Sequence, residues 1–234
     1  RVIEPSAAPR TVPLPTAPAA SNPAARCPDD VSLVIFGASG DLTHRLLLPG
    51  LGTLLNTNPS CRVTVIGAAV DELSDADWAR RVRDSLAGAS TKPARIDDIV
   101  SRTRYVKIDV TDAAAIGPFV AALPADTVLY FALPPSVTMK ACRALADVAL
   151  PAGLKLALEK PFGTDGASAH EFNALLAKLV PERQIFRVDH FLGKATVLNL
   201  MGLRFTNRIF EPVWNATNIE SVQIVVDETL ALEG

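Results

Sequence analysis

The residues near the start of the chain that are best suited to chemistry form one turn, Gly37-Ala38-Ser39-Gly40-Asp41-Leu42. Its two glycines permit a tight bend and let backbone N–H groups approach an anion, while the N-terminus of a following helix adds partial positive charge. The turn lies between an apolar run, Val31–Phe36, and a segment with apolar residues at helical spacing, Leu42–Leu55. This placement predicts that the turn binds the pyrophosphate of a dinucleotide, although any sharp strand-to-helix turn can use glycine and Asp41 could simply cap the helix.

The form of the dinucleotide depends on the residues that follow the second apolar run, Arg62–Ile66. An acidic side chain at this place binds a ribose 2′-hydroxyl, whereas an arginine accommodates a 2′-phosphate. Here the run is followed by Val70, Asp71 and Glu72, and the two carboxylates would repel a 2′-phosphate. Locally these residues favour NAD over NADP, with Arg45 left as a cation that could reach the same region.

The elements that must position these residues alternate between strand and helix. Three further apolar runs have strand character, at Tyr105–Val110, Thr127–Ala132 and Leu154–Leu158. The helical patterns lie at Ser74–Leu86, Ala113–Leu123, Ser136–Leu150, Ala167–Leu179 and Lys194–Thr206. Repeated β-α-β units with buried strands require a parallel sheet covered by helices and wound right-handedly. The sequence therefore predicts the α/β class, with a Rossmann-type doubly wound parallel sheet.

The predicted domain organisation follows from changes along the chain in composition and in the alternation of strand and helix patterns. Residues 1–30 carry seven of the 18 prolines and few large apolar side chains, so a disordered tail is expected there. Residues 31–180 form the predicted dinucleotide-binding domain. Residues 181–234 are predicted to begin an α+β substrate-binding domain, which we expect to be incomplete because a strand pattern at Val222–Val226 has no neighbouring strand to pair with.

The overall composition narrows the classes of function. The 23 Lys and Arg residues against 25 Asp and Glu give a formal net charge of −2, which argues against nucleic acid and anionic membranes as partners. The most apolar stretch, 113–139, is interrupted by prolines, so no membrane span is predicted. Three cysteines, Cys27, Cys61 and Cys142, are too few for a disulfide framework or a zinc cluster, so we predict no metal site and a cytoplasmic location.

Four further stretches carry recognisable motifs: Ala132-Leu133-Pro134-Pro135, Glu159–Gly163, Arg187–Lys194 and Asn207–Asn215. Together with the glycine turn they resemble the glucose-6-phosphate dehydrogenase family, in family order and spacing, from about Val31 to the last residue. The resemblance implies transfer of a hydride from C1 of glucose 6-phosphate to a nicotinamide dinucleotide, which yields 6-phosphogluconolactone in the pentose phosphate pathway. It also implies NADP as the cofactor and a homo-oligomer for the full-length protein.

The resemblance also implies roles for individual residues. Lys160, at the end of the fifth predicted strand, is expected to contact both substrate and cofactor, and Pro161 to follow a cis peptide bond that aims Lys160. Asp189 corresponds to a carboxylate that orients a catalytic histidine and stabilises its imidazolium. The implied cofactor-binding residues are the six of the glycine turn, Val70, Asp71, Ala132, Leu133, Pro134 and Lys160.

The implied ligands of the substrate phosphate are His190 and Lys194. Both offer N–H donors to an anion, and their four-residue spacing predicts that one helical turn brings them together. Phe191, where the family usually has tyrosine, removes a hydroxyl from this site. Glu228 is implied to hydrogen-bond sugar hydroxyls, with a solvated strand-end glutamate as the plain alternative.

The sequence departs from the family pattern at two places that matter for catalysis. Its histidines are His44, His170 and His190, and none of them matches the family's general base, so the histidine that Asp189 would orient is not among them. Val70 stands where the family commonly has the arginine for a 2′-phosphate. NAD therefore remains an alternative to the NADP that the family favours.

Two other functions compete with this one. The first is a non-catalytic dinucleotide-binding fragment, or a regulatory relative, that binds the cofactor and transfers no hydride because it has no base. The second is another sugar oxidoreductase of the glucose–fructose oxidoreductase group, in which Glu-Lys-Pro also follows a Rossmann sheet. The runs Asp189–Lys194 and Phe210–Asn215 argue against the second alternative.

Overall fold

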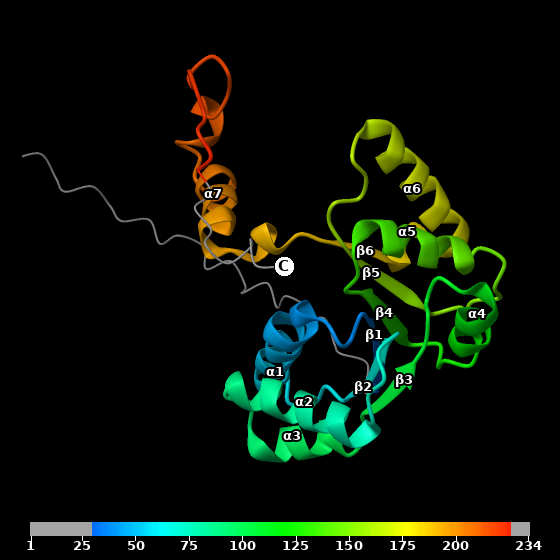
Figure 1. Cartoon of the computed structure of the whole chain (residues 1–234). Helices are drawn as coiled ribbons and strands as arrows, with labels where there is room; N and C mark the ends of the chain where they lie inside the picture. The colour runs from blue at the N-terminus through cyan, green and yellow to red at the C-terminus, as the bar shows by residue number, and fades with distance from the viewer. Residues whose placement is uncertain (1–29, 226–234) are drawn as a thin grey trace, which may run out of the picture. The chain divides into compact units, whose positions relative to one another are not determined.

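The computed structural model describes residues 30–225, and six strands form one sheet within them (Figure 1). The strands span Val31–Phe36 (β1), Val63–Ala69 (β2), Arg104–Lys107 (β3), Thr127–Phe131 (β4), Lys155–Glu159 (β5) and Ile185–Val188 (β6). Their order in the sheet is β3-β2-β1-β4-β5-β6. The pairs β1–β2, β2–β3 and β5–β6 are parallel. This order confirms the predicted α/β class with a doubly wound sheet.

Helices connect and follow these strands (Figure 1). The α-helices are Leu48–Thr57 (α1), Asp75–Gly88 (α2), Pro93–Val100 (α3), Ala113–Ala121 (α4), Pro135–Ala144 (α5), Gly166–Leu179 (α6) and Ala195–Thr206 (α7). The shorter helices are Thr43–Leu47 (η1, a π-helix), Glu182–Gln184 (η2), His190–Gly193 (η3) and Glu211–Val213 (η4). Ser74 caps α2, because its hydroxyl oxygen accepts a hydrogen bond from the Asp77 N–H at 3.1 Å.

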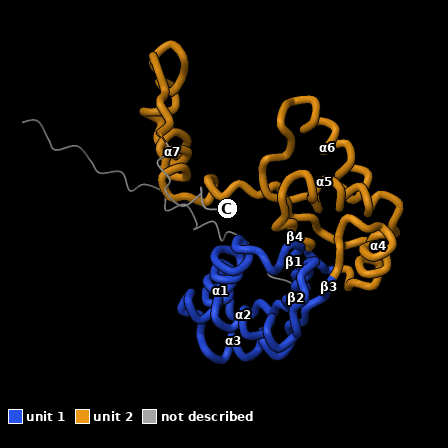
Figure 2. The backbone as a smooth tube through the Cα atoms, viewed as in Figure 1, with its two compact units in different colours: residues 1–107, 126–128 blue, residues 108–125, 129–234 orange. Residues whose placement is uncertain are grey.

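The chain divides into two compact units, residues 1–107 with 126–128 and residues 108–125 with 129–234 (Figure 2). In the first unit, α2 packs against α1, α3 and β3, and its Trp78 side chain is fully buried. A Cβ atom on Gly67 of β2 would lie 2.7 Å from the Trp78 ring, so the glycine lets the indole lie directly on the strand. The indole Nε1 donates to Thr103 Oγ1 at 2.7 Å, which ties α2 to the residues before β3.

The second unit builds its core around β5, α5 and α6. Leu156 of β5 and Phe172 of α6 are among its buried side chains. Gln184, which precedes β6, is also buried, and its Nε2 donates to the carbonyl oxygens of Ala152 at 2.8 Å and Leu154 at 2.9 Å. These two bonds fix the start of β6 against the segment that leads into β5.

Two elements are not predicted, the helix predicted at Ser136–Leu150 ends at Ala144, and one strand prediction is wrong. The patterns do not predict α3 and β6, because segments of eight and four residues carry too little periodicity. The strand predicted at Val222–Val226 is wrong for its described part, since residues 221–225 have no regular structure. Val222 and Ile224 are exposed there. A strand forms by hydrogen bonding to a neighbouring strand, and apolar alternation alone does not supply that neighbour.

The tail predicted at residues 1–30 lies outside the described residues except for Asp30. The domain boundary predicted at residue 180 stays a prediction. Between residues 30 and 225, no helix is long and apolar enough to cross a membrane.

Candidate functional site

The glycine turn follows β1 and is held against the end of β2 by backbone hydrogen bonds. The register pairs Phe36 with Ala68, and the next N–H, that of Gly37, donates to the Ala68 carbonyl at 2.9 Å. Gly37 has a φ of +81°, a left-handed conformation that glycine adopts without strain. The Gly40 N–H donates to the Gly37 carbonyl at 3.0 Å, and a Cβ on Gly40 would lie 3.2 Å from that oxygen. Gly37 therefore suits its left-handed conformation and Gly40 avoids a crowded contact, which fits a backbone that approaches a pyrophosphate.

The helix after the turn, η1, has Leu42 as its N-cap residue and no side-chain cap. Thr43 Oγ1 donates to the Gly37 carbonyl at 3.2 Å, which closes the turn onto the helix. Asp41 does not cap this helix, because its carboxylate accepts a hydrogen bond from Arg45 Nη1 at 3.1 Å. Arg45 is thereby held on its own helix, which weakens the suggestion that it reaches the residues after β2.

The residues after β2 carry the carboxylate predicted to bind a ribose. Ser39 Oγ donates to the Asp71 carboxylate, and Arg81 Nη1 of α2 donates to the Ser39 carbonyl at 3.4 Å. The Tyr105 hydroxyl of β3 donates to the Asp71 carbonyl at 2.8 Å. Burial and the negative charge of Asp71 together raise the pKa of Tyr105. Val70 is 59% exposed. Sequence reasoning finds Asp71 and misses Arg81 and Tyr105, because these come from other elements, α2 and β3, and carry no motif.

Ala132, Leu133 and Pro134 connect β4 to α5. Pro134 is the residue before the first turn of α5, and Thr138 Oγ1 of that helix donates to the Leu133 carbonyl at 3.4 Å. Pro135 occupies the first position of α5, which suits proline because the first helical N–H groups have no partner within the helix. The motif thus serves the start of α5, and its contact with a cofactor stays a prediction.

A second part of the candidate site lies at the carboxyl ends of β5 and β6. These parallel strands pair Glu159 with Val188, so the next residues along each strand, Lys160 and Asp189, lie side by side. Lys160 Nζ and Asp189 Oδ1 are 2.8 Å apart, and the Phe191 N–H donates to the same oxygen at 3.0 Å. The hydrogen bonds from Lys160 and then from Phe191 lower the pKa of Asp189. The strand register, rather than any local motif, brings this ion pair together.

Glu159, the residue before Lys160, is held by a hydrogen bond from Tyr130 that the sequence patterns do not predict. The Tyr130 hydroxyl of β4 donates to the Glu159 carboxylate of β5. Burial, and then this contact with a carboxylate, raise the pKa of Tyr130. The peptide bond between Lys160 and Pro161 is cis, as the resemblance implies.

Phe191 lies among three basic side chains. The Nζ atoms of Lys160 and Lys194 are 4.6 Å and 4.5 Å from the centroid of its ring, and the His190 ring centroid is 4.5 Å away. Both ammonium groups are within the range of cation–π attraction. The prediction that one helical turn unites His190 and Lys194 is wrong, because His190 lies in the 3₁₀-helix η3 and Lys194 is extended between η3 and α7. The aromatic ring is what they share, and sequence reasoning considered Phe191 only for its missing hydroxyl.

The other candidate residues lie elsewhere. His44 Nδ1 is 2.6 Å from the hydroxyl of buried Ser85, and His170 is an exposed residue of α6. Glu228 lies outside the described residues. Over residues 30–225, no group of three His, Cys, Asp or Glu side chains is arranged to hold a metal ion.

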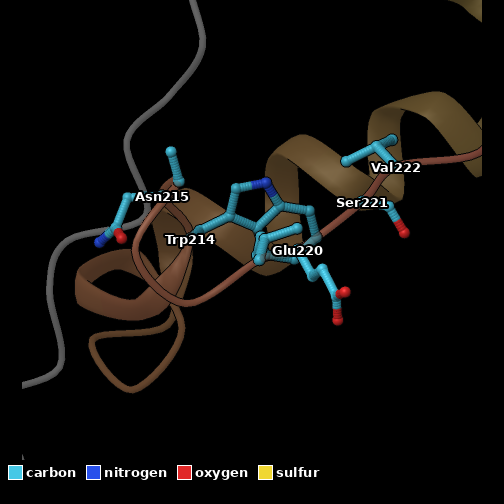
Figure 3. Close-up of a pocket in the computed structure, with 7 residues that line it drawn as sticks. Trp214, Asn215, Glu220, Ser221 and Val222 are labelled. Carbon is cyan, nitrogen blue, oxygen red and sulfur yellow. The ribbon is translucent and has the colours of Figure 1, made fainter.

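A hollow of about 310 Å³ lies beside Trp214 (Figure 3). Its lining comprises Trp214, Asn215, Ala216, Ile219, Glu220, Ser221 and Val222. The indole of Trp214 lies among the lining residues, and the Glu220 carboxylate extends away from the ring (Figure 3). The hollow includes none of the predicted site residues, and a single carboxylate gives it no recognisable chemistry.

Two protein-family models match this chain. Residues 34–199 match the NAD binding domain of glucose-6-phosphate dehydrogenase, and residues 201–234 match the C-terminal domain of the same family. The cytoplasmic isoform of glucose-6-phosphate 1-dehydrogenase from Solanum tuberosum is 33% identical over 223 residues, and the glucose-6-phosphate 1-dehydrogenase of Mycolicibacterium smegmatis is 37% identical over 219 residues. Each alignment covers 87% of this chain and 44% of the relative.

Solved structures of the same enzyme are also similar. Glucose-6-phosphate 1-dehydrogenase from Mycobacterium avium has a TM-score of 0.67 at 33% identity, covering 81% of this chain and 42% of that one. A glucose-6-phosphate dehydrogenase in complex with its substrate glucose-6-phosphate has a TM-score of 0.69 at 28% identity. This match covers 83% of this chain and 43% of that one. The chain thus spans less than half the length of these relatives. Because the first family model alone matches most of its residues, the chain belongs to the glucose-6-phosphate dehydrogenase family.

Proposed function

We propose that this chain is the coenzyme-binding part, with the beginning of the substrate-binding part, of a glucose-6-phosphate 1-dehydrogenase. Such an enzyme transfers a hydride from C1 of glucose 6-phosphate to a nicotinamide dinucleotide and yields 6-phosphogluconolactone. Residues 31–180 would be the coenzyme domain and residues 181–234 the start of the substrate domain. The observation that carries the proposal is the Lys160–Asp189 pair beside the Phe191 ring, at the carboxyl ends of two neighbouring parallel strands, where α/β sheets bind their ligands.

The coenzyme is proposed to bind at the glycine turn. Gly37 and Gly40 permit close approach of the backbone to a pyrophosphate, and the helix that follows presents its positive end. When bound, the nicotinamide accepts the hydride. NADP is the form that the resemblance implies, whereas Val70 and Asp71 favour NAD.

The substrate is proposed to bind through Lys160, His190 and Lys194. The Lys160 ammonium has three N–H bonds, and the one directed at Asp189 leaves others for a sugar hydroxyl or a phosphate oxygen. Asp189, whose pKa is lowered by Lys160 and the Phe191 N–H, stays ionised at neutral pH and keeps the ammonium in place. Glu228 is proposed as an additional ligand of the sugar hydroxyls.

The proton of the C1 hydroxyl needs a base, and no histidine of this sequence corresponds to the family's base. His44 contacts Ser85, His190 lies against Phe191, and His170 carries no motif. The second candidate function, a dinucleotide-binding protein without hydride transfer, shares the dinucleotide site and differs from the first in having no such base. We therefore expect negligible turnover of glucose 6-phosphate by this chain on its own.

A homo-oligomer of the complete polypeptide and a cytoplasmic location are further parts of the proposal. The Solanum tuberosum relative is described as a cytoplasmic isoform. The near-neutral charge of the chain gives no reason to expect association with nucleic acid or anionic membranes.

The test is calorimetric binding of glucose 6-phosphate and of each dinucleotide, alongside the formation of reduced nicotinamide. The Lys160→Ala variant should bind glucose 6-phosphate at least roughly tenfold more weakly, since it loses a charge-assisted donor. Lys178→Ala, which removes an exposed ammonium from α6, should bind it like the parent chain. Equal binding by the parent chain and Lys160→Ala would overturn the substrate site, and sustained turnover by the parent chain would rule out the second candidate function.

A further inference from the structure

We propose that Asp71 selects the coenzyme by the group on the 2′ carbon of its adenosine ribose, so that this chain binds NAD more tightly than NADP. The inference rests on the proposed dinucleotide site and deepens it. It concerns the first compact unit alone, in which the glycine turn, the end of β2, α2 and β3 lie.

Asp71 is held in place at both its backbone and its side chain. The Tyr105 hydroxyl donates to the Asp71 carbonyl at 2.8 Å, which fixes the loop after β2. Ser39 Oγ donates to the Asp71 carboxylate, which ties that carboxylate to the glycine turn. Pyrophosphate and adenosine ribose are adjacent groups of one ligand. A carboxylate tied to the pyrophosphate turn is therefore placed next to the ribose.

The chemistry of this carboxylate distinguishes the two coenzymes. One oxygen accepts the Ser39 hydrogen bond, and the other oxygen remains available to accept from a ribose 2′-hydroxyl. A 2′-phosphate carries close to two negative charges at neutral pH and offers no donor when ionised. Like charges at contact distance disfavour binding strongly. The neighbouring Glu72 contributes less, because its carboxylate is paired with Lys107 at 2.9 Å.

Arg81 of α2 is a cation that contacts the glycine turn. Its guanidinium donates to the Ser39 carbonyl at 3.4 Å, so Arg81 and Asp71 both contact the same residue of the turn. The adjacent Arg80 is engaged differently, since it pairs with Asp77 at 2.7 Å. If the charge of Asp71 is removed, Arg81 becomes the group that can bind a 2′-phosphate. Removing the charge of Asp71 should therefore shift the preference from NAD towards NADP.

The test compares two probes that cannot be turned over, ADP-ribose and 2′-phospho-ADP-ribose, by titration calorimetry on the full chain. The parent chain should bind ADP-ribose more tightly. Asp71→Asn, which keeps the shape and an oxygen for Ser39, should shift the affinity ratio towards the phosphorylated probe by about tenfold or more. The double variant Asp71→Asn/Arg81→Gln should lose that gain.

Two matched controls remove one charge from a neighbouring residue. Glu72→Gln and Arg80→Gln should each change the ratio by less than about threefold, because exposed paired charges act weakly. Circular dichroism and thermal unfolding establish that each variant is folded.

Tighter binding of the phosphorylated probe by the parent chain, or an unchanged ratio in Asp71→Asn, would overturn the inference and leave the dinucleotide site standing. If the folded parent chain bound neither probe, the dinucleotide site itself would be wrong and the selection by Asp71 would fall with it.

Discussion

Helices α2 and α7 have similar lengths, 14 and 12 residues, but their side chains are buried to opposite extents. α2 is the more highly charged helix, yet it buries Trp78, Val82, Ser85 and Leu86. In α7 no residue is buried over Ala195–Thr206, all of which the structure describes. The large apolar side chains that α7 exposes are Leu198, Leu200, Met201, Leu203 and Phe205.

This difference shows which parts of the candidate site are held by a core. Arg81 projects from α2, whose direction is fixed by the buried Trp78, so the residues around Asp71 rest on a rigid support. His190 and Lys194 lie next to α7, which has no buried side chain to hold it. Their positions depend on short contacts with Phe191 and on the cap that Asp189 provides for η3.

The largest expected effect is that of Trp78→Ala. Removing a fully buried indole, together with its hydrogen bond to Thr103, should lower the free energy of unfolding by about 3–5 kcal/mol. Phe205→Ala in α7 should change it by less than about 0.5 kcal/mol, because Phe205 is 57% exposed. Urea unfolding followed by circular dichroism measures both values. A loss of similar size for the two variants would mean that α7 is as well packed as α2.

Tyr130→Phe should lower the free energy of unfolding by a smaller amount. This variant tests whether the part of the second unit that precedes α7 is well packed. The variant keeps the aromatic ring and removes the hydroxyl, so the Glu159 carboxylate loses this hydrogen-bond donor. Hydrogen bonds to charged groups contribute about 1.5–3 kcal/mol, and a loss in that range is expected in urea unfolding. Tyr105→Phe, whose hydroxyl meets a neutral carbonyl, should lose less. The reverse order of the two losses would contradict this account.

Gly67→Ala should destabilise the chain by about 1–3 kcal/mol, because the added Cβ would lie 2.7 Å from the Trp78 ring. The matched change in α7 is Gly202→Ala, whose Cβ would meet nothing within 4 Å. That variant should raise the helix content or leave it unchanged, since alanine favours helix over glycine. Thermal unfolding of both variants distinguishes the packed contact between Gly67 and Trp78 from the open space beside Gly202. Destabilisation by Gly202→Ala would reveal a packed face on α7.

The smallest effect concerns the pH dependence contributed by Asp189. Its pKa is lowered in the folded chain, so its ionised form stabilises the fold above the unfolded-state pKa of about 3.9, and this stabilisation disappears as the pH falls through the folded value. Asp189→Asn should therefore be less stable than the parent at neutral pH, and the gap should close in acid. In a Lys160→Gln background the gap should shrink, because the main partner of Asp189 is gone. A gap that is independent of pH would show that the pair does not act through its charge.

The regular elements with strong local patterns could be predicted well. β1 begins and ends at the predicted residues, Val31 and Phe36, and the glycine turn follows it directly. The cis bond before Pro161 agrees with what the family resemblance implies. α3 and β6 are too short to show a period, and Val222–Val226 shows an apolar alternation without a partner strand. Prediction thus succeeded where the cause of a structure lies within neighbouring residues.

The sequence by itself determined the parallel α/β class, the turn at Gly37 and Gly40, and the residue types available for binding anions. Only the tertiary structure decided which of those residues meet. Ser39 reaches Asp71 across 32 positions of sequence, and Lys160 meets Asp189 because the β5–β6 register places Glu159 beside Val188. Phe191 became a shared neighbour of Lys160 and Lys194 through a 3₁₀ turn rather than an α-helical one. Local patterns set the elements, but contacts between distant residues depend on strand register and packing, which no local pattern encodes.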